Sequence, residues 1–138
     1  MEITSVPFFN KVGIGKTDEG TLTLPIDDSV LNHLNTLNAS ALFTLAEAAS
    51  GDALQNHFPE LAGKVIPVLR DSQIKFRKPA TTDVMAFPSM STETVERFKE
   101  QLVKKGRALI EVEVEVRDRE NTTICLASFN WFVQRIEA

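Results

Sequence analysis

The alternation of apolar and polar positions divides the chain into strands and two helices. Alternating or β-branched runs bounded by turn residues predict strands at residues 8–14, 21–26, 65–76, 83–89, 110–116 and 122–136. Two longer segments of strong helix formers predict one helix that begins at residue 39 and ends near residues 52–57, and a second helix at residues 93–105. The resulting element order is β-β-α-β-β-α-β-β, which predicts an α+β fold.

The two predicted helices differ in how charge is distributed around them. Segment 39–51 carries one charge, Glu47, and small or apolar residues cover most of its circumference, so this helix belongs in an interior. Segment 93–105 keeps its apolar residues on one face and is followed by a glycine, as expected of a surface helix. We therefore expect one antiparallel sheet wrapped around a central helix, with an extra surface helix at 93–105. A dimer would cover the side of the sheet that one helix leaves open.

Composition limits the class of protein. With 138 residues, 43% hydrophobic and 25% charged, the chain is expected to form a single domain over residues 1–138. Its net charge of −4 argues against a nucleic-acid partner. No apolar run approaches the roughly 20 residues of a membrane helix, and the first residues lack the pattern of a signal peptide. With Cys125 as the single cysteine, we expect a cytoplasmic protein with no membrane partner.

Several common sites can be set aside. Residues 15–17 read Gly-Lys-Thr, but Asn10 stands where a phosphate-binding loop needs its first glycine. His33 and His57 form no ligand-spaced cluster with Cys125, so no metal is expected. Cys125 lies in a predicted strand, where a buried apolar role is the simpler interpretation.

Glu47 and the polar loop before its helix form the remaining candidate site. A carboxylate on an apolar helix must lie in a crevice, pair with another group or take up a proton, which makes Glu47 a candidate base or nucleophile. The loop brings Asn32 and Asn38 to the helix N-terminus, where the Ala39 and Ser40 amides could bind an oxyanion or a polarised carbonyl. The structural alternative is that Asn38 or Ser40 caps the helix and Glu47 is a core acid.

The spacing along the helix adds a constraint. Ala39 and Glu47 are eight residues apart, about 12 Å along a helix. One reacting carbon atom cannot contact both, so a shared substrate requires Glu47 of one chain and Ala39 of another.

These residues resemble the signature of the hot-dog fold acyl-CoA thioesterases of the phenylacetate-degradation type. That signature is approximately Asn-x-x-Gly-x-x-His-Gly-Gly, with Asp or Glu nine residues after the His in a Leu-Ala-Asp-like context. Asn32 falls on the family Asn, and Glu47, preceded by Leu45-Ala46, falls on the acid. Residues 71–80 resemble the family strand that ends in a Pro-Ala corner, and the likeness extends over roughly residues 20–136.

The chain departs from the signature at four positions. Asn38 replaces the His, Ala39-Ser40 replace the two glycines, and Asn35 replaces the first Gly. The family's polar partner on the next strand falls near Leu69, an apolar residue that cannot replace it. The candidate replacements are Arg70, Asp71 and Ser72.

The resemblance implies hydrolysis of a small or medium acyl-CoA or acyl-carrier thioester by a homodimer, or by a homotetramer built as a dimer of dimers. Coenzyme A would be part of the substrate, and no separate cofactor is implied. Ala39 N–H would polarise the thioester carbonyl, either alone or together with Ser40 N–H. Glu47 would activate water or attack the carbonyl carbon directly. Asn32 and Asn38 would orient water or substrate. Beyond these catalytic candidates, the substrate-binding candidates are Ser40, Phe43, Arg70, Asp71 and Ser72.

Two rival functions use the same fold. A non-catalytic acyl-CoA or lipid-binding protein is favoured by the absent His and glycine pair. A dehydratase or isomerase usually needs a His beside the acid, and only His33 is near in sequence.

Overall fold

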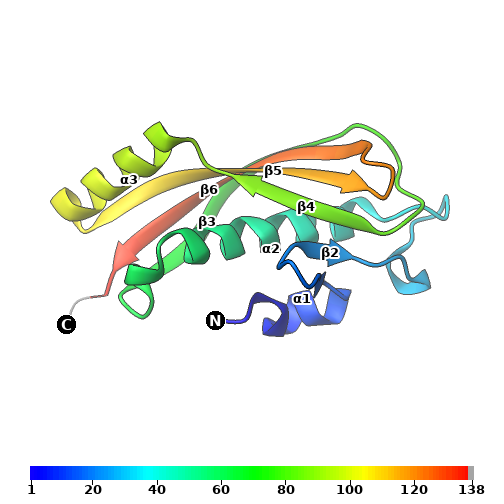
Figure 1. Ribbon diagram of the computed structural model, residues 1–138, viewed down its shortest axis with the longest axis horizontal. Coiled ribbons are helices and arrows are strands. Elements are labelled where there is room, and N and C mark those ends of the chain that lie inside the picture. The colour runs from blue at the N-terminus through cyan, green and yellow to red at the C-terminus, as the bar shows by residue number, and fades with distance from the viewer. Residues whose placement is uncertain (137–138) are drawn as a thin grey trace.

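Six antiparallel strands form one curved sheet in the computed structural model, which describes residues 1–136 (Figure 1). In spatial order they are β1 (Gly15–Lys16), β2 (Leu22–Leu24), β4 (Val84–Ser89), β5 (Arg107–Asp118), β6 (Thr123–Arg135) and β3 (Val65–Phe76). The strand predicted at 65–76 is confirmed, and the predicted C-terminal hairpin is β5 and β6. Strand β3 pairs only with β6, so its other edge is unpaired within the described chain.

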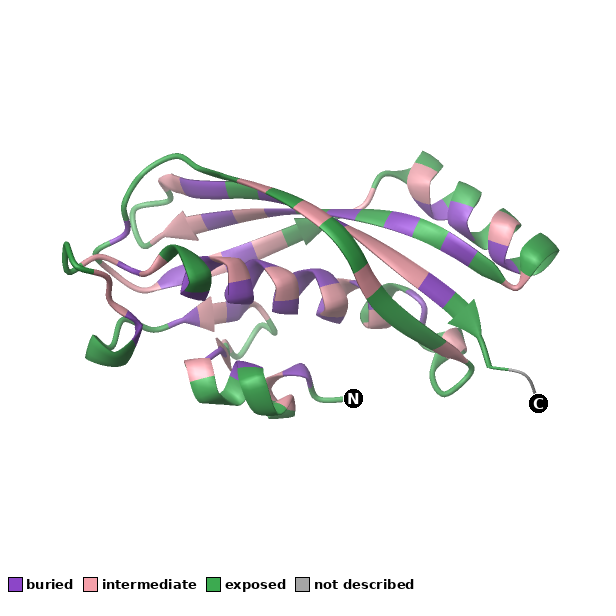
Figure 2. Cartoon of the chain, turned by 180° about the vertical axis from the view of Figure 1, so that it is seen from behind, coloured by how far each residue is buried: buried purple, intermediate pink, exposed green. Residues whose placement is uncertain are grey.

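The long helix α2 (Ala39–His57) lies along the concave side of the sheet, between the strands and the N-terminal segment (Figure 1). It packs against β2, β4, β5 and β6, and most of its residues are buried (Figure 2). The sequence predicted this burial, because the helix carries almost no charge. A single sheet wrapped around one central helix is the hot-dog fold that the resemblance implied.

Helix α3 (Thr92–Lys105) lies near one end of the sheet, against β5, and buries one face (Figures 1 and 2). Ser91 caps it by accepting a hydrogen bond from Thr94 N–H at 3.1 Å. Gly106 ends it in the left-handed region at φ 71°, which a glycine adopts without strain. The predicted surface helix at 93–105 is therefore confirmed.

The prediction of a strand at residues 8–14 is wrong. These residues fall mostly in α1 (Pro7–Val12), which follows a short 3-10 turn, η1 (Ile3–Ser5). Pro7 occupies the first turn, where its missing N–H costs nothing, and Gly13 ends the helix at φ 98°. Phe9 points into the core. The first strand is β1, which is short and begins at Gly15, two residues after Gly13.

Two further 3-10 turns lie on either side of α2. They are η2 (Asp28–Val30), in the loop before the helix, and η3 (Pro59–Leu61), just after it. The helix ends at His57, within the range of residues 52–57 predicted for its end, and Leu54 is buried there in an apolar cluster with Phe58 and α3.

Candidate functional site

The loop before α2 is held together by Asn32. Its Oδ1 accepts hydrogen bonds from Leu34 N–H at 2.9 Å and Thr36 N–H at 3.1 Å, and its Nδ2 donates to Thr36 Oγ1 at 2.9 Å. Asn35 occupies the left-handed region at φ 60°, where the family signature has a glycine. Asn32 therefore shapes the loop that leads the chain into the helix N-terminus.

The N-terminus of α2 presents one unoccupied amide. Asn38 caps the helix, because its Oδ1 accepts a hydrogen bond from Ser40 N–H at 2.8 Å. Ala41 N–H donates to the Asn38 carbonyl at 3.0 Å. Within residues 1–136, Ala39 N–H donates no hydrogen bond, and both Ala39 and Ser40 are exposed. Of the amides predicted to be available, Ala39 is the one that can polarise an incoming oxygen.

Glu47 lies in the middle of α2 with an unpaired carboxylate. It is half-buried, and over residues 1–136 its side chain makes no hydrogen bond or ion pair. The same residues contain no sealed side-chain oxygen or nitrogen without a partner, so the carboxylate oxygens must reach solvent. Burial among apolar neighbours raises the pKa of Glu47. This carboxylate is thus neither a sealed core acid nor an ordinary surface charge.

Helical spacing shows which way Glu47 points. Phe43 and Gly51 lie four residues before and after it, on the same face of α2. Phe43 packs edge-on against Phe129 of β6, with ring centroids 5.4 Å apart. A Cβ added to Gly51 would lie 3.4 Å from the ring of Trp131, also on β6. Glu47 therefore faces the β6 side of the helix, next to the edge strand β3.

The three candidates on β3 separate onto opposite faces of the sheet. Ser72 pairs with the buried Phe129 and so shares the face that carries α2. Asp71 accepts a hydrogen bond from Asn130 Nδ2 at 2.7 Å on the other face. Arg70 lies at the β-bulge, with its guanidinium 4.6 Å from the centroid of the Phe132 ring. Among these candidates, Ser72 alone lies on the Glu47 side of its own protomer.

The structure brings some of the predicted residues together and leaves Glu47 apart. Asn32, Asn38 and Ala39 meet at the helix N-terminus, whereas Glu47 lies about 12 Å further along the same helix. Phe43 lies between these two points, against the sheet. One protomer therefore contains both the free Ala39 N–H and the Glu47 carboxylate, but the two groups are too far apart to contact the same carbon atom.

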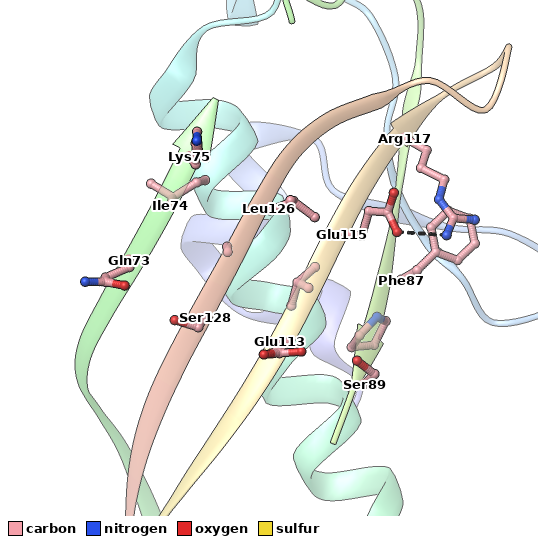
Figure 3. A pocket seen from close by; sticks show the side chains of 13 residues that line it. Gln73, Ile74, Lys75, Phe87, Ser89, Glu113, Glu115, Arg117, Leu126 and Ser128 are labelled. Atoms are coloured by element: carbon pink, nitrogen blue, oxygen red, sulfur yellow. Dashed lines mark hydrogen bonds and ion pairs between the residues drawn. The ribbon is translucent and has the colours of Figure 1, made fainter. Parts of the chain in front are cut away.

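A wide groove of about 820 Å³ lies on the outer face of the sheet, away from α2 (Figure 3). An ion pair between Arg117 and Glu115, at 2.8 Å, lies on this face. The groove contains none of the predicted site residues. Over the part of the chain that the structure describes, no group of His, Cys, Asp and Glu could hold a metal ion, and no helix is long and apolar enough to cross a membrane.

Sequence reasoning missed a link between α2 and β6 beside Glu47. The fully buried Ser50 donates from Oγ to the Glu47 carbonyl at 2.7 Å and accepts a hydrogen bond from Trp131 Nε1 at 3.0 Å. Ser50 and Trp131 are 81 positions apart in sequence, so no local pattern connects them. The available signal was a single tryptophan in an inward-facing strand position opposite the small residues Ser50 and Gly51.

Comparisons with solved structures agree with the fold. A Pseudomonas aeruginosa protein described as a probable thioesterase is 20% identical, with a TM-score of 0.80 over 97% of this chain and 91% of its own. A Haemophilus influenzae thioesterase is 18% identical, with a TM-score of 0.72 over 99% of this chain and 89% of its own. A Bacillus halodurans protein solved with CoA is 25% identical, with a TM-score of 0.68 over 88% and 72%. These likenesses place the chain among the hot-dog folds.

Residues 3–133 match the family described as "Domain of unknown function (DUF4442)", and the chain belongs to that family. No curated protein matches the sequence.

Proposed function

We propose that this protein hydrolyses small or medium acyl-CoA thioesters, with Glu47 as base or nucleophile. The observation that carries the proposal is the unpaired, half-buried Glu47 carboxylate in an otherwise apolar helix. Structural acids in interiors are normally hydrogen-bonded or paired, and this one is not. A relative of this chain binds CoA, which supports CoA as the thiol carrier.

We propose further that the active site spans two protomers. The Ala39 amide of one chain would receive the thioester oxygen, and Glu47 of the other would act on the carbonyl carbon or on water. The separation of about 12 Å within one chain supports this arrangement. The unpaired edge of β3 also supports it, because Ile66 and Val68 are exposed there and a free edge readily pairs with another strand.

The chemistry can proceed along two routes. In the first, Glu47 takes a proton from water, the water oxygen bonds to the carbonyl carbon, and the C–S bond breaks to release the CoA thiol and the acid. In the second, Glu47 attacks the carbonyl carbon, the thiol leaves, and water hydrolyses the resulting anhydride. In both, Ala39 N–H stabilises the negative charge that develops on the oxygen. Asn32 and Asn38 would act by shaping and capping this helix end, or through the second N–H of each amide group.

The alternative is a non-catalytic acyl-CoA-binding protein. Asn38 favours it, because its carboxamide oxygen is committed to Ser40 N–H at the position where the thioesterases carry a His. Binding would then use the same residues without cleavage of the thioester.

An acyl-CoA panel with wild type, Glu47→Ala and Glu100→Ala tests the proposal. We expect wild type and Glu100→Ala to release thiol, and Glu47→Ala to lower kcat by at least about 100-fold. Cys125 adds little background in a thiol assay because it is buried, and burial raises its pKa to about 12. Equal rates in Glu47→Ala and wild type would remove Glu47 from the mechanism. Acyl-CoAs that raise the melting temperature without being cleaved would favour the binding alternative.

A further inference from the structure

A second cavity lies on the concave side of the sheet, at the C-terminal end of α2. Its volume is about 590 Å³, within the range of pockets that hold small ligands. The walls come from the N-terminal segment, the end of α2, η3 and the sheet; they include Ile3, Phe9, Gly51, Phe58 and Trp131. Within residues 1–136, no charged side chain lines it. The wall therefore offers a charged metabolite no oppositely charged side chain, whereas it offers an aliphatic chain mostly apolar contact.

The buried polar groups of Ser50 and Trp131 next to this cavity already have hydrogen-bond partners. Trp131 turns its indole N–H to Ser50 Oγ, which leaves its ring to form apolar wall. At the rim, Gln55 Nε2 donates to the Met1 carbonyl at 2.8 Å and holds the N-terminal segment over the opening. The cavity therefore attracts an occupant through its shape and apolar surface, not through hydrogen bonds.

The cavity begins one helical turn from Glu47. Gly51 follows Glu47 by four residues on the same helix face, about 6 Å along the axis. From Gly51 to Phe58 the wall continues for about 10 Å more. Gly51 brings no side chain to the stretch between Glu47 and the cavity, and a Cβ there would already lie 3.4 Å from the Trp131 ring.

We infer that this cavity binds the acyl chain of the substrate, with the thioester held at Glu47 and an aliphatic chain of about twelve carbons extending past Gly51 toward Phe58. The inference rests on the proposed thioesterase function and names its substrate class. An extended residue spans about 3.6 Å over its three backbone bonds, or roughly 1.2 Å per bond. We take the same advance per bond for an extended acyl chain. About 16 Å of helix therefore corresponds to about thirteen bonds.

Chain length gives the first test. Burying each further methylene should raise kcat/KM for the acyl-CoA about threefold to fourfold. We expect this rise from butanoyl-CoA to about dodecanoyl-CoA, followed by a plateau or a fall at hexadecanoyl-CoA. An equal kcat/KM for all chain lengths in an active enzyme overturns the inference and leaves the thioesterase proposal standing.

Two variants locate the chain. Gly51→Val places two methyl groups against Trp131 at the end of the cavity nearest Glu47, and we expect the ratio of kcat/KM for dodecanoyl-CoA to that for butanoyl-CoA to fall at least tenfold. Ala53→Val is the matched control, because it adds the same side chain to the same helix at a half-buried position outside the cavity wall. If Gly51→Val fails to fold, Ala62→Phe narrows the cavity from an exposed rim position outside α2. An unchanged ratio in the folded cavity variants overturns the inference.

Binding separates the two proposals. Calorimetry on Glu47→Gln should show dodecanoyl-CoA binding at least tenfold more tightly than free CoA, and Gly51→Val in that background should remove most of the difference. If wild type cleaves no acyl-CoA but this pattern holds, the cavity inference stands and the hydrolase proposal fails. If dodecanoyl-CoA and CoA bind equally, something other than the acyl chain, such as a segment of a second copy, fills the cavity and the inference fails.

Discussion

Helices α2 and α3 lie against the same sheet, yet their glutamates are in opposite situations. Glu100 on α3 is exposed and hydrogen-bonded to Lys104 at 2.9 Å, which lowers its pKa. Glu47 on α2 is half-buried without a partner, and burial raises its pKa. One acid is stabilised in its charged form, and the other is held in an environment that disfavours the charge. The contrast separates a helix that carries an ordinary surface ion pair from the helix that carries the carboxylate we propose as catalytic.

The largest expected effect concerns the start of α2. Ala39→Pro removes the free N–H without breaking the helix, because proline fits the first helical position and Asn38 already has the extended conformation required before it (φ −64°, ψ 140°). We expect thioester hydrolysis to fall about 100-fold to 1,000-fold, the usual cost of removing one oxyanion donor. Circular dichroism should show an intact fold, and undiminished hydrolysis would exclude the amide from the reaction.

The same variant sharpens the two-protomer proposal. Co-expressed Glu47→Ala and Ala39→Pro chains would form mixed dimers in which one of two sites is intact. Random mixing should restore about a quarter of wild-type activity to two otherwise inactive proteins. No recovery in verified mixed dimers would mean that both groups act from one chain.

The second-largest expected effect concerns a substitution in α3. Leu102 is almost fully buried between α3 and the sheet, and Leu102→Ala should lower the free energy of unfolding by about 3 kcal/mol. Under native conditions kcat should be unchanged, since Leu102 lines neither the cavity nor the candidate site. Urea denaturation and steady-state kinetics measure the two quantities. A loss of kcat with little loss of stability would mean that α3 takes part in the site.

A smaller effect should appear in the pH dependence of stability. The pKa of Glu47 is higher in the folded than in the unfolded protein, so the folded state binds more protons between the two values. Its contribution to the free energy of unfolding therefore falls as pH rises from about 4.5 through the folded-state pKa. Glu47→Gln should be more stable than wild type at pH 7 and lose that advantage at pH 4. Denaturation curves at both pH values that show a constant difference would contradict the raised pKa.

The smallest effect is expected for Glu100→Gln, with the opposite sign. The folded-state pKa of Glu100 is lowered, so its contribution is present above the unfolded value and is lost as pH falls through the folded value. Because Glu100 is fully exposed, the melting temperature at pH 7 should fall by no more than about 1 °C, and less in high salt. A large shift would show that α3 depends on this pair.

Much of the fold could be predicted, because its main elements have local causes. The nearly uncharged helix, the amphipathic helix with its glycine stop and the alternating β5 each carry their pattern within about fifteen residues. The error at residues 8–14 also has a local cause. A run of apolar residues is compatible with strand or helix, and Pro7 together with Gly13 decided for a helix.

The candidate site could be predicted only in part, because it depends on contacts between distant segments. Glu47 stood out as an isolated charge, and the position of Asn38 before a helix indicated its capping bond. The hydrogen bond from Trp131 to Ser50 and the cavity that it borders could not be predicted from local spacing. Asp71 and Ser72 point to opposite faces as neighbouring strand residues do, but which of them faces α2 depends on the β-bulge at Arg70, which no periodicity revealed.

Trp131 is the only tryptophan in the chain, and its ring forms part of the cavity wall beside Gly51. The protein therefore carries its own optical reporter at the place where an acyl chain would enter. Displacing water from around the indole should shift its fluorescence emission toward shorter wavelength, so occupancy can be followed in unlabelled protein during a single turnover.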